Sequence, residues 1–161
     1  MSEPIVGRML PSERAWVATT WLRSFEHAEL HHVTREQYWR AFGDLVDALL
    51  DSGETWVARN PEDETQALAW ACRARGENTL HYVYAKWTMR DCQSMGRPLC
   101  IAAFVLGATG LNMGRGLRTS FNTVAWMKYA AKHGIQFEHD RQLVAVTRAG
   151  IRRAPREEKA A

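Results

Sequence analysis

The spacing of apolar residues changes along the chain from a helical to a strand-like period. In the first third, apolar side chains recur every three to four positions, first in residues 16–25 and then in residues 38–50. This spacing predicts two helices that each turn one face to the core. The short apolar segment Ile5 to Leu10 predicts a strand before them. Thr34-x-x-Gln37 is a capping box, so we expect the second helix to begin at Thr34.

Three segments in the middle of the chain follow a period of two, which is typical of strands. They span residues 55–59, 67–73 and 79–86. The clusters between them, Asn60-Pro61-Glu62-Asp63 and Arg75-Gly76-Glu77-Asn78, are rich in turn-forming residues. We therefore expect the three segments to form an antiparallel meander.

Helical and strand-like patterns alternate in the last third of the chain. A helix is predicted from about Arg97 to Thr109, a short strand from Leu117 to Phe121, and a helix from Thr123 to His133 with Gly134 as its left-handed cap. Residues 135–146 predict one or two final strands. The order of elements predicts an α/β domain with a mixed, mostly antiparallel twisted sheet flanked by helices.

Length and charge predict one domain with a separate tail. The chain has 161 residues and seven tryptophans, which suffice for a single core. Its net charge of +3 comes entirely from residues 148–161, which hold five basic and two acidic residues. We expect these residues to form a disordered basic tail after a domain over residues 1–147. Because that domain is formally neutral, we expect no binding to nucleic acid.

Cysteine usage and hydropathy indicate the compartment. Three cysteines without a CxxC pair fit a reducing environment better than a disulfide framework. We see no signal peptide and no apolar stretch long enough to cross a bilayer. We therefore expect a cytoplasmic protein without membrane contact. His27 and His31 have the spacing of a helical pair but no recognisable third ligand, so we expect no metal site.

The segment from Thr79 to Pro98 carries the most chemical information. A strand runs there into a polar loop that opens a helix. The first N–H groups of a helix lack intrahelical acceptors and lie at the positive end of its dipole, so they can bind a pyrophosphate. Gly96 would allow the chain to approach the phosphates closely.

This loop resembles that of the GNAT superfamily, the Gcn5-related N-acetyltransferases. Residues Gln93 to Pro98, Gln-Ser-Met-Gly-Arg-Pro, are similar to the family pattern Gln/Arg-x-x-Gly-x-Gly/Ala, with Pro98 in the last place. A second register, which resembles small phage-encoded GNAT-like proteins, uses Leu80 to Tyr84, Lys86 and Arg90 and places Gln93 where a glycine is expected. Both registers stay open at this point.

A second, independent pattern lies downstream. Asn122-x-x-Ala125-x-x-x-Tyr129 is similar to the GNAT pattern in which the asparagine contacts the cofactor and the tyrosine protonates the departing thiolate. The resemblance implies acetyl-CoA as the cofactor and direct attack by an amine, with Tyr129 as general acid. His81 is the candidate base, because the strand offers no glutamate. A core role for Tyr129 is the alternative.

The resemblance also implies which residues bind the cofactor. They lie on the third strand of the meander, in the loop and before the last helix: Val83, Tyr84, Ala85, Arg90, Gln93, Ser94, Met95, Gly96, Arg97 and Asn122.

Two functions compete on this evidence. The first is an acetyl-CoA-dependent N-acyltransferase that acts on an amine of a small molecule or a protein. The second is a GNAT-like phage protein that binds and modulates a host protein, with exposed aromatic residues such as Trp87 as its contact surface. Both are compatible with the fold, because fold does not fix function. An edge strand near the C-terminus also leaves a homodimer open.

Overall fold

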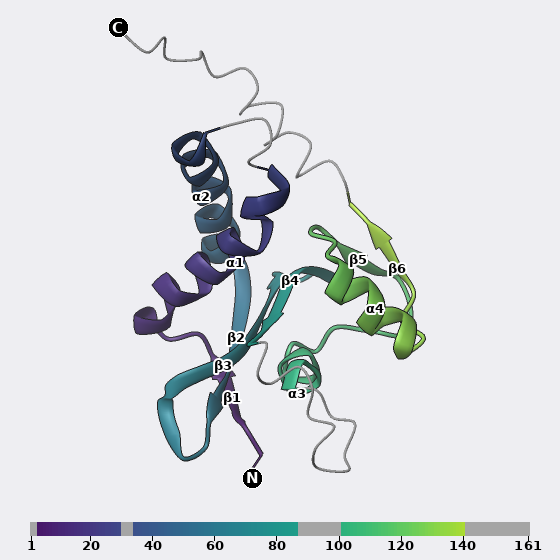
Figure 1. Ribbon diagram of the computed structural model, residues 1–161. Helices are drawn as coiled ribbons and strands as arrows, with labels where there is room; N and C mark the ends of the chain where they lie inside the picture. The colour runs from purple at the N-terminus through teal and green to yellow at the C-terminus, as the bar shows by residue number, and fades with distance from the viewer. Residues whose placement is uncertain (1–2, 30–33, 87–100, 141–161) are drawn as a thin grey trace, which may run out of the picture.

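The computed structural model describes residues 3–29, 34–86 and 101–140, and the structural statements below refer to these residues (Figure 1). The strands are β1 (Ile5–Arg8), β2 (Gly53–Asn60), β3 (Asp63–Ala74), β4 (Thr79–Ala85), β5 (Leu117–Thr119) and β6 (Phe137–His139). The helices are α1 (Arg14–Glu29), α2 (Arg35–Ser52), α3 (Ile101–Ala108) and α4 (Val124–Lys132), and a turn of 3-10 helix, η1 (Pro11–Glu13), precedes α1.

The six strands form one mixed sheet in the order β1-β2-β3-β4-β5-β6. The pairs from β1 to β4 are antiparallel, whereas β4 pairs with β5, and β5 with β6, in parallel. The predicted meander is therefore confirmed as β2, β3 and β4. The change of direction at β4 follows from the chain between β4 and β5, which passes through α3 instead of a short turn.

The helices cover both faces of the sheet, and the two faces have different cores (Figure 1). Beneath α1 and α2 the core is aromatic, with Trp21, Tyr38 and Trp70 fully buried. Beneath α3 the strands β2 and β3 present small side chains, which include Ala58, Ala69 and Ala71. Small residues allow a helix to lie close to a sheet, so α3 packs on the centre of the sheet. The predicted α/β fold class is confirmed.

Local signals place the ends of α2 and α4 as expected. Thr34 Oγ1 accepts a hydrogen bond from the Gln37 N–H at 3.3 Å, and the Gln37 side chain accepts one from the Thr34 N–H at 3.1 Å. Thr123 caps α4 by accepting from the Trp126 N–H at 3.1 Å. After α4, Gly134 has a φ of 65°, which confirms the predicted left-handed residue. Thr123 and Gly134 thus mark the two ends of α4, the helix that lines the cavity next to β4.

Some predictions concern parts of the chain that the structure does not describe. The predicted helix over residues 97–109 corresponds to α3 from Ile101 onward, and residues 97–100 lie outside the described part. The tail over residues 148–161 and the strand pattern beyond residue 140 lie outside it as well. Among the described helices, none combines the length and apolar character needed to cross a bilayer.

Candidate functional site

A β-bulge at His81 sets the geometry of β4. In the pairing of β3 with β4, Cys72 lies opposite Tyr82 but Arg73 lies opposite Leu80, so His81 is an extra residue on β4. An extra residue shifts the alternation of a strand by one position. Accordingly, Leu80 packs with the residues on the α3 side of the sheet, and so do Val83 and Ala85 beyond the bulge.

The strands β4 and β5 separate just after this bulge. Their register covers Thr79 and Leu80, and the last hydrogen bonds run from the Ser120 N–H to the Leu80 carbonyl at 3.1 Å and from the Phe121 N–H to the His81 carbonyl at 3.2 Å. Beyond these bonds, no register between the two strands continues in the described residues. A gap therefore opens between the second half of β4 and the segment that leads into α4.

The main chain of β4 turns polar groups toward this gap. The Lys86 N–H donates to the Leu68 carbonyl of β3 at 3.0 Å, so Lys86 faces β3. Since successive residues of a strand point their N–H and C=O groups to opposite edges, the groups of Val83 and Ala85 face away from β3.

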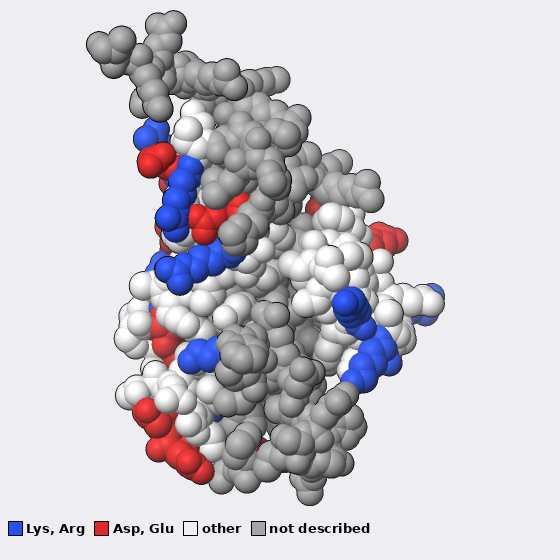
Figure 2. Space-filling model, viewed as in Figure 1, with Lys and Arg blue, Asp and Glu red and all other residues white. Residues whose placement is uncertain are grey.

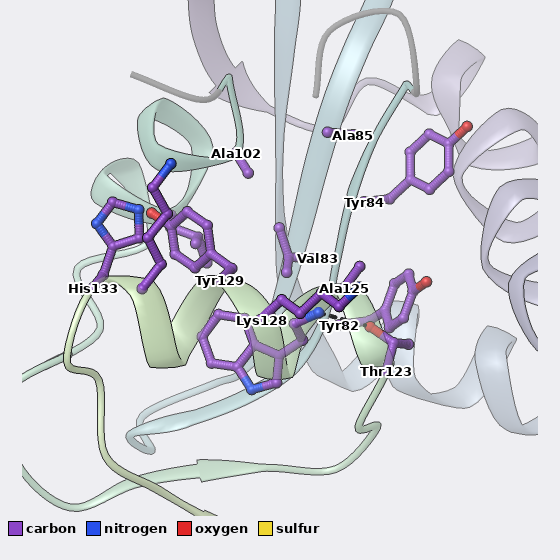
Figure 3. A pocket seen from close by; sticks show the side chains of 13 residues that line it. Tyr82, Val83, Tyr84, Ala85, Ala102, Thr123, Ala125, Lys128, Tyr129 and His133 are labelled. Atoms are coloured by element: carbon purple, nitrogen blue, oxygen red, sulfur yellow. Dashed lines mark hydrogen bonds between the residues drawn. The ribbon is translucent and has the colours of Figure 1, made fainter. Parts of the chain in front are cut away.

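A cavity of about 340 Å³ occupies the gap (Figure 3). Its walls are the second half of β4, one side of α3 and the length of α4. The lining residues are Tyr82, Val83, Tyr84, Ala85, Ala102, Leu106, Thr123, Ala125, Trp126, Lys128, Tyr129, Lys132 and His133. The structure thus brings together four residues predicted from the sequence, namely Val83, Tyr84, Ala85 and Tyr129.

Tyr82 and Tyr84 belong to the cavity and to the aromatic core at once. Tyr82 stacks on Trp21 with ring centroids 5.5 Å apart, and Tyr84 meets Trp16 edge-on at 5.9 Å. In Figure 3 both rings point toward the helices that cover the other face of the sheet, whereas Val83 points between them and Tyr129. Rigid aromatic packing on the far face therefore fixes the position of this half of β4.

Tyr129 lies in the cavity wall beside a histidine. Its ring centroid is 4.4 Å from that of His133 and 6.0 Å from that of Trp126. Figure 3 shows Tyr129 and His133 on the side of the cavity where Ala102 lies. Tyr129 is half-buried and so has one side in the helix packing and one in the cavity. This placement is compatible with the predicted acid role, and the role itself stays a prediction.

His81 is buried behind the bulge and does not line the cavity. Only 7% of the residue is exposed, and its Nδ1 lies 2.8 Å from the Ser120 hydroxyl oxygen. Burial lowers the pKa of His81 below 6.5, and the charge of Glu77 opposes this shift only in part. The imidazole is therefore neutral at pH 7, which suits a base, but it has no direct path to the cavity.

Asn122 lies directly before the helix cap Thr123, which lines the cavity. Its side-chain Oδ1 is buried and has no hydrogen-bond partner among the described residues. Buried acceptors are almost always paired in folded proteins. Asn122 itself does not belong to the described lining of the cavity, so its predicted contact with the cofactor stays a prediction.

The rim of the cavity is basic. Lys128, Lys132 and His133 line it and are exposed, and no acidic side chain belongs to the described lining. Figure 2 shows the basic side chains gathered over α4. The sequence predictions missed these residues, although the spacing of Lys128 and Lys132 already places them one helical turn apart on α4.

Several predicted residues lie outside the described part of the chain. They are Trp87 and the loop residues Arg90, Gln93, Ser94, Met95, Gly96 and Arg97. The structure therefore does not test either register of the loop. Within the described residues, no group of three or more His, Cys, Asp or Glu side chains lies close enough together to hold a metal ion.

Comparisons with known proteins agree with the fold. No protein-family model matches the chain, and no curated protein matches it. Among solved structures, a possible acetyltransferase from Clostridium difficile 630 matches 86% of this chain and 93% of its own, with a TM-score of 0.50 and 12% identity. The apo form of YjaB from Escherichia coli matches 83% of this chain and 80% of its own, with a TM-score of 0.48 and 20% identity.

A third solved structure is titled a GCN5-related N-acetyltransferase, aminotransferase class II, from Rhodopseudomonas palustris. It matches 82% of this chain and 81% of its own, with a TM-score of 0.46 and 18% identity. At 12% identity, the match to the Clostridium difficile structure, with its TM-score of 0.50, indicates a shared fold and leaves the activity open. The described part of the chain therefore has the predicted fold class, a mixed six-stranded sheet flanked by helices.

Proposed function

We propose that the chain is an N-acyltransferase that holds acetyl-CoA, or a related CoA thioester, between β4 and α4 and transfers the acyl group to an amine. The observation that carries this proposal is the opening of the sheet next to the His81 bulge. It produces a cavity of about 340 Å³ along a strand edge whose main-chain groups are turned into the gap. The GNAT-like fold supports the same proposal.

The residues around the cavity fit the acyl end of this cofactor. Its pantetheine arm is narrow and carries amide groups, so it can lie along the second half of β4, at Val83, as an added strand would. Ligand pockets span roughly 300–1,000 Å³, and this cavity lies at the small end of that range. It suits the arm and the acyl group, with the nucleotide outside.

Acetyl-CoA, when bound, supplies an activated thioester carbonyl. The chain's own part is to orient that carbonyl and to move protons. The Val83 N–H, which faces the gap, is our candidate donor to the carbonyl oxygen as negative charge develops there. The Tyr129 phenol is our candidate donor of a proton to the sulfur that leaves.

In this scheme His81 is the base, and the proton reaches it indirectly. Its lowered pKa keeps the imidazole neutral at pH 7 and so able to accept a proton. Because neither its side chain nor Ser120 lines the cavity, it can act only through a relay that includes a water molecule, and the Ser120 hydroxyl, 2.8 Å from its Nδ1, is one possible member of that relay. His81 is thus our candidate for a relayed base.

Calorimetric titration with acetyl-CoA tests the proposal. We expect micromolar binding to the full chain. Gly96→Glu is the matched variant, because it adds bulk and negative charge to the predicted pyrophosphate loop and should abolish binding. If the unaltered protein shows no binding at millimolar acetyl-CoA, the proposed function is wrong.

The rival prediction, binding of a host protein by a phage-encoded chain, rests on different residues. Its contact residue Trp87 lies outside the described part of the chain. It predicts that capture of the partner survives Gly96→Glu and fails after Trp87→Ala. This alternative and the identity of the acceptor amine stay predictions from the sequence.

A further inference from the structure

Two lysines of the cavity rim carry charges that the described structure leaves unpaired. Lys128 and Lys132 are four residues apart on α4, and both line the cavity and are exposed. No described carboxylate forms an ion pair with either of them. His133 lines the same rim. Such a rim favours a ligand with an anionic group at the mouth of the cavity.

We infer that Lys128 and Lys132 bind the 3′-phosphate on the ribose of CoA, so that the protein distinguishes CoA from dephospho-CoA. This inference rests on the proposed function. It concerns the nucleotide end of the cofactor, whereas the proposal above concerns its acyl end.

The assignment to the 3′-phosphate follows from where each anionic group of CoA can lie. The pyrophosphate belongs, on the proposed function, to the predicted loop before α3. The 3′-phosphate is the remaining anion, and it lies at the end of the cofactor that the small cavity leaves in solvent. Lys128 and Lys132 are exposed and belong to α4, so they are available to it without competing with that loop.

Lysine suits this task because an ammonium group on a flexible stem binds a phosphate oxygen without a fixed orientation. A different role is available to Lys132, which lies in the last turn of α4 and can stabilise the negative end of the helix dipole. That role affects the stability of the helix but not the ratio of the affinities for CoA and dephospho-CoA. The ratio is therefore the quantity to measure.

The experiment is calorimetric titration with CoA and with dephospho-CoA at low and moderate salt. The protein, the double variant Lys128→Gln/Lys132→Gln and the control Lys86→Gln are compared. Lys86 suits the control because it carries the same charge but does not line the cavity, and its Nζ lies 5.7 Å from the centre of the Trp16 ring. Glutamine has nearly the helix propensity of lysine, and circular dichroism checks that the variants fold.

We expect the protein and the Lys86 control to prefer CoA by about tenfold at low salt, which is the effect of two exposed charge pairs, and by less at moderate salt. The double variant should bind both compounds with the affinity that the protein has for dephospho-CoA. Equal binding of CoA and dephospho-CoA by the unaltered protein would overturn the inference but not the proposed function.

Three further outcomes are decisive. A preference that persists in the double variant overturns the inference, because other groups then read the 3′-phosphate. An equal loss of affinity for both compounds also overturns it, since the lysines then bind a group that the two share, such as the pyrophosphate. Absence of binding by either compound to the unaltered protein overturns the proposed function, and the inference with it.

Discussion

His81 is the described histidine whose environment most clearly alters its proton affinity. Its imidazole is buried against Ser120, and desolvation lowers its pKa below 6.5 despite the nearby charge of Glu77. In the unfolded chain the same group titrates at about its ordinary value. Between these two values the unfolded state binds more protons than the folded state. The contribution of His81 to stability is therefore present above pH 6.5 and is lost as the pH falls below it.

We predict that acidification from about pH 7.5 to about pH 5.5 lowers the melting temperature more in the unaltered protein than in His81→Gln. Glutamine keeps a hydrogen-bonding side chain but does not titrate. The hydrogen bond from Arg8 lowers the pKa of Glu54 from 4.5, so Glu54 changes its charge only below the pH range of this experiment. Thermal unfolding at both pH values gives the comparison. An equal change in the two proteins would show that His81 does not titrate with unfolding.

Tyr129 allows a test that separates catalysis from packing. Phenylalanine keeps the ring contacts with His133 and Trp126 and removes only the hydroxyl. We predict that Tyr129→Phe lowers kcat by roughly 10²-fold and leaves the affinity for CoA nearly unchanged, because the proton is needed only as the thiolate departs. Steady-state kinetics with calorimetry measures both quantities. Turnover at the level of the unaltered protein would assign Tyr129 to the core.

Main-chain atoms of α2 and β3 lie close to Gly53, where α2 ends and β2 begins. A Cβ added to Gly53 would lie 2.6 Å from the Leu49 carbonyl oxygen and 2.8 Å from that of Arg73. Both are main-chain atoms, one in α2 and one in β3, so neither moves aside easily. The glycine at this junction permits the chain to pass directly from the helix into the strand.

We predict that Gly53→Ala destabilises the protein by about 1–3 kcal/mol. Gly43 is the matched control, because it lies inside α2 and an added Cβ there meets nothing within 4 Å. Gly43→Ala should stabilise the protein by about 0.5–1 kcal/mol through helix propensity. Urea denaturation of both variants measures whether the free energy of unfolding falls in Gly53→Ala and rises in Gly43→Ala. A stable Gly53→Ala variant would mean that the junction relaxes at little cost.

The elements show how far the sequence predicts the fold. Period-two segments and turn clusters predicted β2, β3 and β4, and the capping box predicted the start of α2, because each is a local signal. The bulge at His81 has no such signal. Residues 80–84 carry large side chains on both faces of the sheet, and the polar residue among them, His81, is itself buried. The register of this strand therefore depends on its pairing with β3.

Some residues of the candidate site could likewise be predicted from the sequence, whereas others depend on the tertiary structure. The GNAT-like motif predicted that Tyr129 belongs to the site, and the structure places it in the cavity wall. The sequence predicted both His81 and Val83 as site residues, but only Val83 lines the cavity. Which residues of β4 face the cavity depends on the bulge, which the sequence pattern does not reveal. The role of Lys128 and Lys132 depends on how α4 crosses β4, which is tertiary information.

At the scale of the whole molecule, a buried ion pair joins the start of the chain to the sheet. Arg59 donates to both carboxylate oxygens of Glu13, at 2.6 and 2.8 Å, and to the Arg8 carbonyl at 2.9 Å. The side chains of Arg59 and Glu13 are only 7% and 12% exposed. The contact connects β1, η1 and β2, so the stability of the whole fold depends on it.

We predict that Glu13→Gln costs about 3 kcal/mol of unfolding free energy, since it leaves a buried guanidinium without its counter-charge. Asp47→Asn is the control, because it breaks an ion pair with Arg14 in which the Asp47 side chain is 60% exposed. That change should cost less than about 1 kcal/mol. Chemical denaturation measures the loss of unfolding free energy in each variant. Similar small costs would show that water reaches Arg59 once the carboxylate is gone.

The bulge at His81 has a consequence for how the chain tolerates change. The edge of β4 that we propose for the cofactor consists of main-chain atoms, so substitutions at residues 82–85 alter the cavity wall but keep the direction of its N–H groups. Loss of one residue between Tyr82 and Ala85 would instead shift the pairing with β3 by one position and exchange the faces of the residues beyond it. Chains with few residues in common can thus keep this edge, provided that none gains or loses a residue along it.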